Sequence, residues 1–422
     1  MPFSRRDALR GMLALGASLP IVGLGCRGDD KRPQQVPAPA TKPKPRKLVV
    51  LFLSGGPDGV LTLDPKTPSE VEGWVDNPTH TESITAGNMR LGSLWAPLSK
   101  WAERMAIVHG VQVESANHFA GTWQFLRMRR RGLLSTPSIF DLIARHQQSP
   151  LGAVTVGHLF NRTYSPGWLA LDGEVVGTSG AQGLSHFDST PRDELAQLAA
   201  ALRENARAPG LRPTDVQSYE RVIAYLDTLQ TVPPLELVPW KVPSGERMGP
   251  PITGMQRVLW ALEHDLASTA LVYFGFNKFD SHWKNLERQQ SVNAAFTGAF
   301  DLFLQGLHAK RNQHGTLAEQ TTILVAGEVG RFPRLNSDHG KDHFPEVSML
   351  LMGAGIATGS KGNIVGQTGK NMLGLPMDLK TGKLGGTKHV MLDNVGSTLL
   401  RLFGIEPTQY GYPSQPIEPL LG

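Results

Sequence analysis

Short uninterrupted runs of apolar residues recur along the chain and predict strands that are buried on both faces. The clearest run is KLVVLFL at residues 47–53, which stops at a Ser-Gly-Gly-Pro turn. Similar runs lie at residues 105–113, 268–275, 321–326 and 347–352. Continuous apolar strands of this kind are typical of parallel sheets, because helices cover both faces of such sheets.

Segments with apolar residues three or four positions apart alternate with these strands and predict helices. They lie at residues 122–131, 255–266, 290–307 and 393–403. The alternation predicts an α/β fold with a doubly wound, mostly parallel sheet. Residues 191–230 carry a longer helical pattern that ends in a Pro-rich stretch, so we expect a helical insertion at about 190–250 within a domain spanning 48–422.

Four of the predicted strands are each followed by a polar or acidic residue. These residues are Asp58, Ser115, Asp280 with His282, and Glu328. Open α/β sheets bind their ligands at the edge where the carboxyl ends of the strands lie. We therefore expect these residues to share one site rather than to be scattered over the surface.

The segment DHGKDH at residues 338–343 concentrates side chains that bind divalent metals. Its candidate ligands are Asp338, His339, Asp342 and His343. Such a density of charge cannot be buried unpaired, and imidazole and carboxylate groups are common metal ligands. Asp280 and His282 are two positions apart and would face the same way on extended backbone. A solvated polar turn, in which Lys341 offsets part of the charge, is the alternative for residues 338–343.

Composition and charge narrow the classes of function. The chain has 422 residues, 40% of them hydrophobic, which supports a large core, and its 46 Gly and 31 Pro indicate many shaped loops. Its pI of about 9.3 suggests nucleic-acid binding, but residues 1–47 carry a net charge of +7 and the remainder a net charge of −2. The basic run at 127–131 has no aromatic stacking platform, so we expect no nucleic-acid partner.

The amino terminus has the pattern of a targeting segment. Arg5 and Arg6 precede an apolar run at 11–25 that is too short to span a membrane, and they resemble a twin-arginine export signal. Cys26, the only cysteine, follows this run as in the lipidation box of lipoproteins and excludes an intrachain disulfide. We expect an export signal at 1–26, with or without lipidation, and a Pro/Lys-rich linker at 27–47.

These expectations imply that the twin-arginine translocase is a partner during export. The protein would then be periplasmic, exposed at the cell surface or lipid-anchored. A lipid on Cys26 would be its only contact with a membrane.

Several of these motifs together resemble domain-of-unknown-function family 1501, placed in the alkaline phosphatase and sulfatase superfamily. The resemblance is carried by GGPDG at 55–59, NHF at 117–119, DSH at 280–282, EVGR at 328–331 and DHGKDH at 338–343. It implies a sheet of the alkaline phosphatase and sulfatase type. It also implies divalent ions held by Asp and His, and a Ser, Thr or modified Cys that attacks a phosphate or sulfate ester.

The resemblance also implies roles for individual residues. The implied metal ligands are Asp58, His118, Asp280, His282, Glu328, Asp338, His339, Asp342 and His343. Zinc is the first choice of ion, with calcium, magnesium and manganese as alternatives. Ser115 lies where the superfamily has its nucleophile. Arg331 could clamp an anionic oxygen or fix Glu328. Asp58 could equally be a turn residue, and His118 a hydrogen-bonded loop histidine.

The expected function is therefore exported, metal-dependent hydrolysis of phosphate or sulfate esters, with a small-molecule or glycan ester as substrate. The alternative is a non-catalytic, metal-stabilised envelope protein that binds an anionic glycan or a protein partner. The third hypothesis is a degenerate member of the fold that binds no metal.

Overall fold

The computed structural model describes residues 47–72, 83–131, 137–147, 153–156, 168–172, 191–243, 249–274, 278–412 and 415–422. The expected export signal, Cys26 and all but the last residue of the expected linker lie outside these ranges. Within them, no helix is both long enough and apolar enough to cross a membrane.

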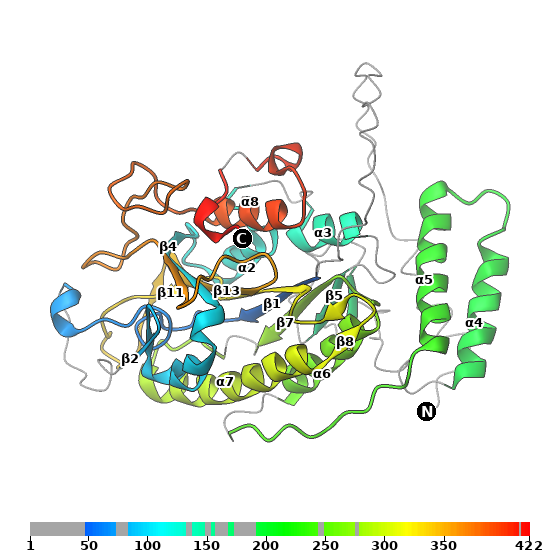
Figure 1. The fold of residues 1–422 in the computed structure, drawn as a ribbon, viewed down its shortest axis with the longest axis horizontal. Helices are drawn as coiled ribbons and strands as arrows, with labels where there is room; N and C mark the ends of the chain where they lie inside the picture. Colours follow the sequence, from blue (N-terminus) through cyan, green and yellow to red (C-terminus); the bar gives the residue numbers. More distant parts are fainter. Residues whose placement is uncertain are drawn as a thin grey trace, which may run out of the picture.

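An eight-stranded sheet forms the centre of the fold (Figure 1). Its strands are β1 (Lys47–Leu53), β4 (Met105–Gln112), β5 (Ala153–Val156), β6 (Trp168–Asp172), β7 (Thr269–Phe274), β10 (Thr321–Ala326), β13 (Glu346–Gly353) and β14 (Asn363–Val365). Their order is β14-β4-β13-β10-β1-β7-β5-β6. Within this sheet, β13 alone runs antiparallel to β1. The expected mostly parallel sheet is confirmed.

The reversed direction of β13 follows from the connection that precedes it. A parallel return needs a crossover, usually a helix, to carry the chain back to the opposite edge. Here the chain after β10 forms a short hairpin of β11 (Gly330–Arg331) and β12 (His343–Phe344). It then re-enters the sheet at the edge where β10 ends, so the residues just before β13 lie beside the carboxyl ends of the parallel strands.

Helices cover both faces of the sheet, as a doubly wound fold requires. Figure 1 shows α2 (His118–Arg127), α3 (Ile139–Gln147) and α8 (Leu392–Leu402) on one face, and α6 (Gly249–Glu263) and α7 (Asn285–Ala309) on the other. Alternate residues of β1 divide between the two cores. Val49 and Leu51 belong to the cluster with α6 and α7, and Leu48 and Val50 to the cluster with α2, α3 and α8.

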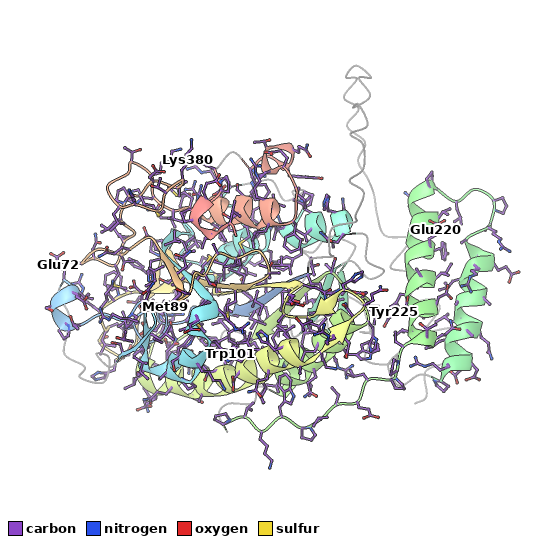
Figure 2. The ribbon with its side chains drawn as sticks, in the orientation of Figure 1. Glu72, Met89, Trp101, Glu220, Tyr225 and Lys380 are labelled. Carbon is purple, nitrogen blue, oxygen red and sulfur yellow. The ribbon has the colours of Figure 1, made fainter. Side chains whose placement is uncertain are left out.

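Smaller elements complete the domain. The remaining strands form two hairpins, β2 (Ser83–Ala86) with β3 (Met89–Gly92) and β8 (Arg311–Asn312) with β9 (Gly315–Thr316). The 3-10 helices are η1 (Pro68–Glu70), η3 (Ser93–Arg104), η5 (Pro407–Tyr410) and η6 (Glu418–Leu420). Trp101 of η3, labelled in Figure 2, donates from Nε1 to Asp301 Oδ1 of α7 over 2.8 Å, which fixes η3 against that helix.

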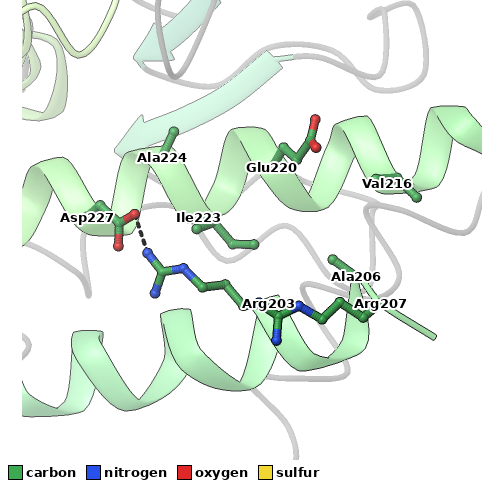
Figure 3. A pocket seen from close by; sticks show the side chains of 8 residues that line it. All are labelled: Arg203, Ala206, Arg207, Val216, Glu220, Ile223, Ala224 and Asp227. Atoms are coloured by element: carbon green, nitrogen blue, oxygen red, sulfur yellow. Dashed lines mark hydrogen bonds and ion pairs between the residues drawn. The ribbon is translucent and has the colours of Figure 1, made fainter.

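The helical pattern at 191–230 corresponds to two helices packed side by side, α4 (Arg192–Asn205) and α5 (Pro213–Thr231). A surface cavity of about 380 Å³ lies between them, and Figure 3 shows the ion pair of Arg203 with Asp227 at its wall. None of the residues that line it is among the candidate site residues. The candidate chemistry therefore lies elsewhere, at the carboxyl edge of the sheet.

Candidate metal centre

The start of α2 positions the first candidate ligand. Asn117 caps the helix, with its Oδ1 accepting a hydrogen bond from Ala120 N at 3.1 Å, so that helical backbone begins at His118. The helix lies directly against the loop after β10. A Cβ atom at Gly121 would be 2.9 Å from the carbonyl oxygen of Glu328. This close approach brings His118 Nδ1 to 2.6 Å from Glu328 Oε1.

Pairing between two loops brings together histidines that are far apart in sequence. Lys341 N donates to Ser281 O at 2.9 Å, and Asn285 N donates to His339 O at 2.8 Å. Only glycine fits at position 340, because a Cβ atom there would lie 1.8 Å from His282 O. The pairing places His282 Nε2 3.0 Å from His343 Nε2.

Three imidazoles each direct Nδ1 at an oxygen acceptor. The pairs are His118 with Glu328 Oε1 at 2.6 Å, His343 with Ala116 O at 2.7 Å, and His282 with Asp342 Oδ1 at 3.1 Å. A carbonyl oxygen can only accept, so His343 carries a proton on Nδ1, and Nε2 is the ring nitrogen left to bind a metal ion. Metal-ligating histidines are commonly held in this way, with the second ring nitrogen donating to an oxygen.

The three Nε2 atoms converge on the carboxylate of Asp280. His282 lies 3.3 Å and His343 3.5 Å from Oδ1, and His118 lies 3.4 Å from Oδ2. Two imidazole nitrogens on a tetrahedral zinc ion would be roughly 3.3 Å apart, given Zn–N bonds of about 2.0–2.1 Å. The ligand atoms of His118, Asp280 and His343 all lie within 4.8 Å of one another. The spacing therefore fits one divalent ion.

Two orphaned polar atoms provide a further test of fit. His118 Nε2 and Glu328 Oε2 are buried and make no hydrogen bond to any described residue. The ligand side of the cluster still reaches solvent, since the side chains of Asp280, His118, His282 and His343 are 17–37% exposed. The candidate ligand atoms thus fit a metal ion that a substrate could approach from solvent.

Electrostatics also favour a cation here. Burial lowers the pKa of His118, but the carboxylates of Asp280 and Glu328 outweigh burial and raise this pKa to about 9. Burial likewise opposes ionisation of Asp280. Contacts with His118, His343 and Arg331 overcome it and hold the pKa of Asp280 well below its usual range. The centre is therefore arranged to keep the Asp280 carboxylate charged.

Arg331 orients Asp280. Its Nη2 donates to Asp280 Oδ1 at 2.7 Å and also to Gly55 O. Nη1 donates to Lys341 O at 2.9 Å, and Nε donates to Gly56 O at 3.2 Å. With its side chain fully buried and its donors directed at these atoms, Arg331 holds a candidate ligand instead of reaching for a substrate oxygen or fixing Glu328.

Asp58 is not part of the group formed by His118, Asp280 and His343. Its side chain is fully buried and lies 2.8 Å from Lys341 Nζ. Asn285 Nδ2 donates to the same oxygen at 2.7 Å, and Val60 N donates to the other at 3.0 Å. Asp58 is thus held within a buried polar network beside the cluster.

The Ser115 hydroxyl makes hydrogen bonds within its own loop. Its hydroxyl donates to Asn117 O at 3.0 Å and accepts from Asn117 N at 3.2 Å. This local turn shapes the segment whose Ala116 carbonyl orients His343. Within the part of the chain that the structure describes, neither hydrogen bond of the Ser115 hydroxyl is to a base that would activate it as a nucleophile.

The DHGKDH segment divides into three roles. His343 enters the cluster and Asp342 orients His282. Asp338 and His339 are exposed, and their backbone carbonyls pair with residues 284–285. Lys341 pairs with Asp58.

Sequence reasoning missed the residues that position the ligands. They are Asn117, the carbonyl of Ala116, Gly340, Asn285 and Asn336. Two signals were available, an Asn at the start of a helical pattern and a Gly inside the histidine-rich segment.

The fold and the side-chain contacts define an α/β protein with a candidate metal centre at the carboxyl edge of its sheet. Residues 245–416 match the model of a family described as a protein of unknown function (DUF1501), which confirms the resemblance over that segment. No curated protein sequence matches the chain.

Several solved structures are similar to this chain at low identity. A protein in the alkaline phosphatase superfamily from Vibrio parahaemolyticus is 11% identical, with 96% of this chain and 76% of that chain covered and a TM-score of 0.36. The lipoteichoic acid synthase LtaP from Listeria monocytogenes is 8% identical, with 86% and 72% covered and a TM-score of 0.38. Wild-type alkaline phosphatase PafA is 10% identical, with 90% and 100% covered and a TM-score of 0.42.

Proposed function

We propose that this protein is an exported, metal-dependent hydrolase of phosphate or sulfate esters. One observation carries the proposal. Three imidazoles direct Nδ1 at oxygen acceptors and converge through Nε2 on the carboxylate of Asp280. Nitrogen-rich sets with one carboxylate favour zinc among the common divalent ions. Export rests on the twin arginines Arg5 and Arg6.

The contribution of each residue follows from its contacts. A divalent ion held there would supply Lewis-acid stabilisation of the negative charge that develops on the ester. Glu328 and Asp342 fix the imidazoles that they contact, and Arg331 fixes Asp280. The amino terminus of α2 adds its partial positive charge at the same edge, which favours an anionic substrate. Because the Ser115 hydroxyl is engaged with Asn117, water is the nucleophile that attacks the ester.

The test compares two histidines of the same segment in the purified full-length protein. Zinc content and hydrolysis of p-nitrophenyl phosphate and p-nitrophenyl sulfate are measured for wild type, His343→Ala and His339→Ala. We expect the first variant to lose both the ion and turnover, because His343 lies in the cluster. The matched variant should keep both, because His339 is exposed. A wild type that takes up no divalent ion contradicts the proposal.

A non-catalytic, metal-stabilised protein that binds an anionic glycan or a protein partner is the second candidate. The local engagement of Ser115 favours it, because the superfamily's nucleophile would then be missing. Tight zinc binding without hydrolysis of any phosphate or sulfate ester would support this candidate over the hydrolase.

A further inference from the structure

A buried ion pair between Asp58 and Lys341 lies beside the candidate metal centre. Asp58 and Lys341 each have a fully buried side chain, and Lys341 Nζ is 2.8 Å from Asp58 Oδ2. The pair is connected to the ligand loop through one chain of contacts. Asn285 Nδ2 donates to Asp58 Oδ2 at 2.7 Å, and Ser281 Oγ lies 2.6 Å from Asn285 Oδ1, between Asp280 and His282 in sequence.

The backbone fixes Lys341 in this position. Its amide donates to Ser281 O at 2.9 Å, and its carbonyl accepts from Arg331 Nη1 at 2.9 Å. Both contacts belong to the loop pairing that brings His282 to His343. The loop pairing therefore fixes the backbone of Lys341, and its fully buried side chain ends at Asp58.

The charges at this edge are nearly balanced without a second metal ion. The buried or partly buried anions are Asp58, Asp280 and Glu328, and the fixed cations are Lys341 and Arg331. Lys341 pairs with Asp58, and Arg331 pairs with Asp280. Glu328 has no such fixed cation, and its Oε2 lacks a hydrogen bond to any described residue. These five groups sum to −1, so one divalent ion brings the sum to +1, which a single anionic ligand offsets, whereas two ions would bring it to +3.

We infer that the centre holds a single divalent ion per chain, because the Lys341 ammonium group occupies the cation position beside Asp58. This inference rests on the proposed metal centre. It assigns His118, Asp280, His282 and His343 to the ion, and it assigns Asp58 to Lys341.

The first experiment measures the zinc-to-protein ratio of the full-length protein. The protein is saturated with zinc and desalted, and the ratio is read by elemental analysis and native mass spectrometry. We expect about one ion per chain. A ratio of two overturns the inference and leaves the metal centre standing. A ratio of zero removes the metal centre, and the proposed function falls with it.

Two variants test the role of Lys341 itself. Lys341→Met leaves the Asp58 carboxylate without its partner, so we expect the zinc ratio to rise above one in excess zinc. In the presence of a chelator, its Tm should be several degrees below that of Asp58→Asn/Lys341→Met, in which neither side chain of the pair is charged. The double variant should retain one ion.

Two results with these variants would overturn the inference, with folding checked by circular dichroism. One is a folded double variant that has lost its ion, since Asp58 or Lys341 would then belong to the ion's own site. The other is a Lys341→Met protein that keeps a ratio of one and is as stable as the double variant, since Lys341 would then supply no necessary charge.

Discussion

Glu328 illustrates how a single residue affects the centre without joining the group of ligand atoms. Its Oε1 lies 2.6 Å from His118 Nδ1 and also accepts from Gly55 N at 2.9 Å. The carboxylate therefore fixes the direction of the His118 ring and makes its other nitrogen a stronger donor to a cation. Glu328 thus supports metal binding through His118.

Replacing the carboxylate by an amide tests this role. Glu328→Gln keeps the size of the side chain and removes its charge, so we expect zinc affinity to fall about 10–100-fold with the fold retained. Competition against a chromophoric chelator measures the change. Asp338→Asn is the matched control, since Asp338 is exposed and lies outside the cluster, and its affinity should equal that of wild type. Equal affinity in both variants would refute the role given to Glu328.

At the scale of elements, the centre depends on two loops whose backbones are in direct contact. The loops at 281–285 and 336–341 pair through backbone hydrogen bonds, and Trp283 forms an antiparallel bridge with His339. At Gly340 the two loops are so close that no side chain fits. A Cβ atom added there would lie 1.8 Å from His282 O. This pairing sets the distance between His282 and His343.

A single added methyl group should therefore separate these ligands. We expect Gly340→Ala to push the two loops apart and to abolish stoichiometric zinc binding, as measured by elemental analysis after desalting. Gly59→Ala is the control, because a Cβ atom at Gly59 has nothing within 4 Å, although it is next to Asp58. A Gly340→Ala protein that still binds zinc as wild type does would show that the loop contact is dispensable.

The sequence predicted elements better than the contacts between them. The predicted strands at 47–53 and 321–326 coincide with β1 and β10, because continuous apolar runs are a local signal. The antiparallel direction of β13 has no local sequence signal, since it depends on the hairpin after β10. Local sequence determines whether a segment forms a strand or a helix, whereas the direction of a strand in the sheet depends on the path of the connection before it.

The same division holds for the site. The shared edge and the candidate set could be predicted, because polar residues after parallel strands converge there. The sequence could not separate His343 from His339, which are four positions apart in one segment. The pairing of residues 336–341 with a loop about sixty positions earlier decides which of the two reaches Asp280. The partners of Arg331 and Lys341 likewise depend on tertiary contacts.

At the scale of the whole molecule, the centre links distant parts of the chain. His118 comes from the start of α2, Asp280 from the loop after β7, and His343 from the hairpin before β13. Each segment is anchored to a different strand of the sheet. An ion that binds all three can be held only by the assembled fold, so ion binding and folding are thermodynamically linked.

This linkage predicts a zinc-dependent Tm. Free zinc at about 100 times its Kd should stabilise the fold by about 2.7 kcal/mol. With an unfolding entropy of about 2.1 cal/mol/K per residue, that corresponds to a rise of about 3 °C for a domain of this size. Differential scanning calorimetry with and without chelator measures the shift. His343→Ala should show none, whereas His339→Ala should match wild type. An equal shift in both variants would mean that zinc stabilises the protein by binding at another place. The centre at Asp280 would then not be the site through which zinc links the three segments.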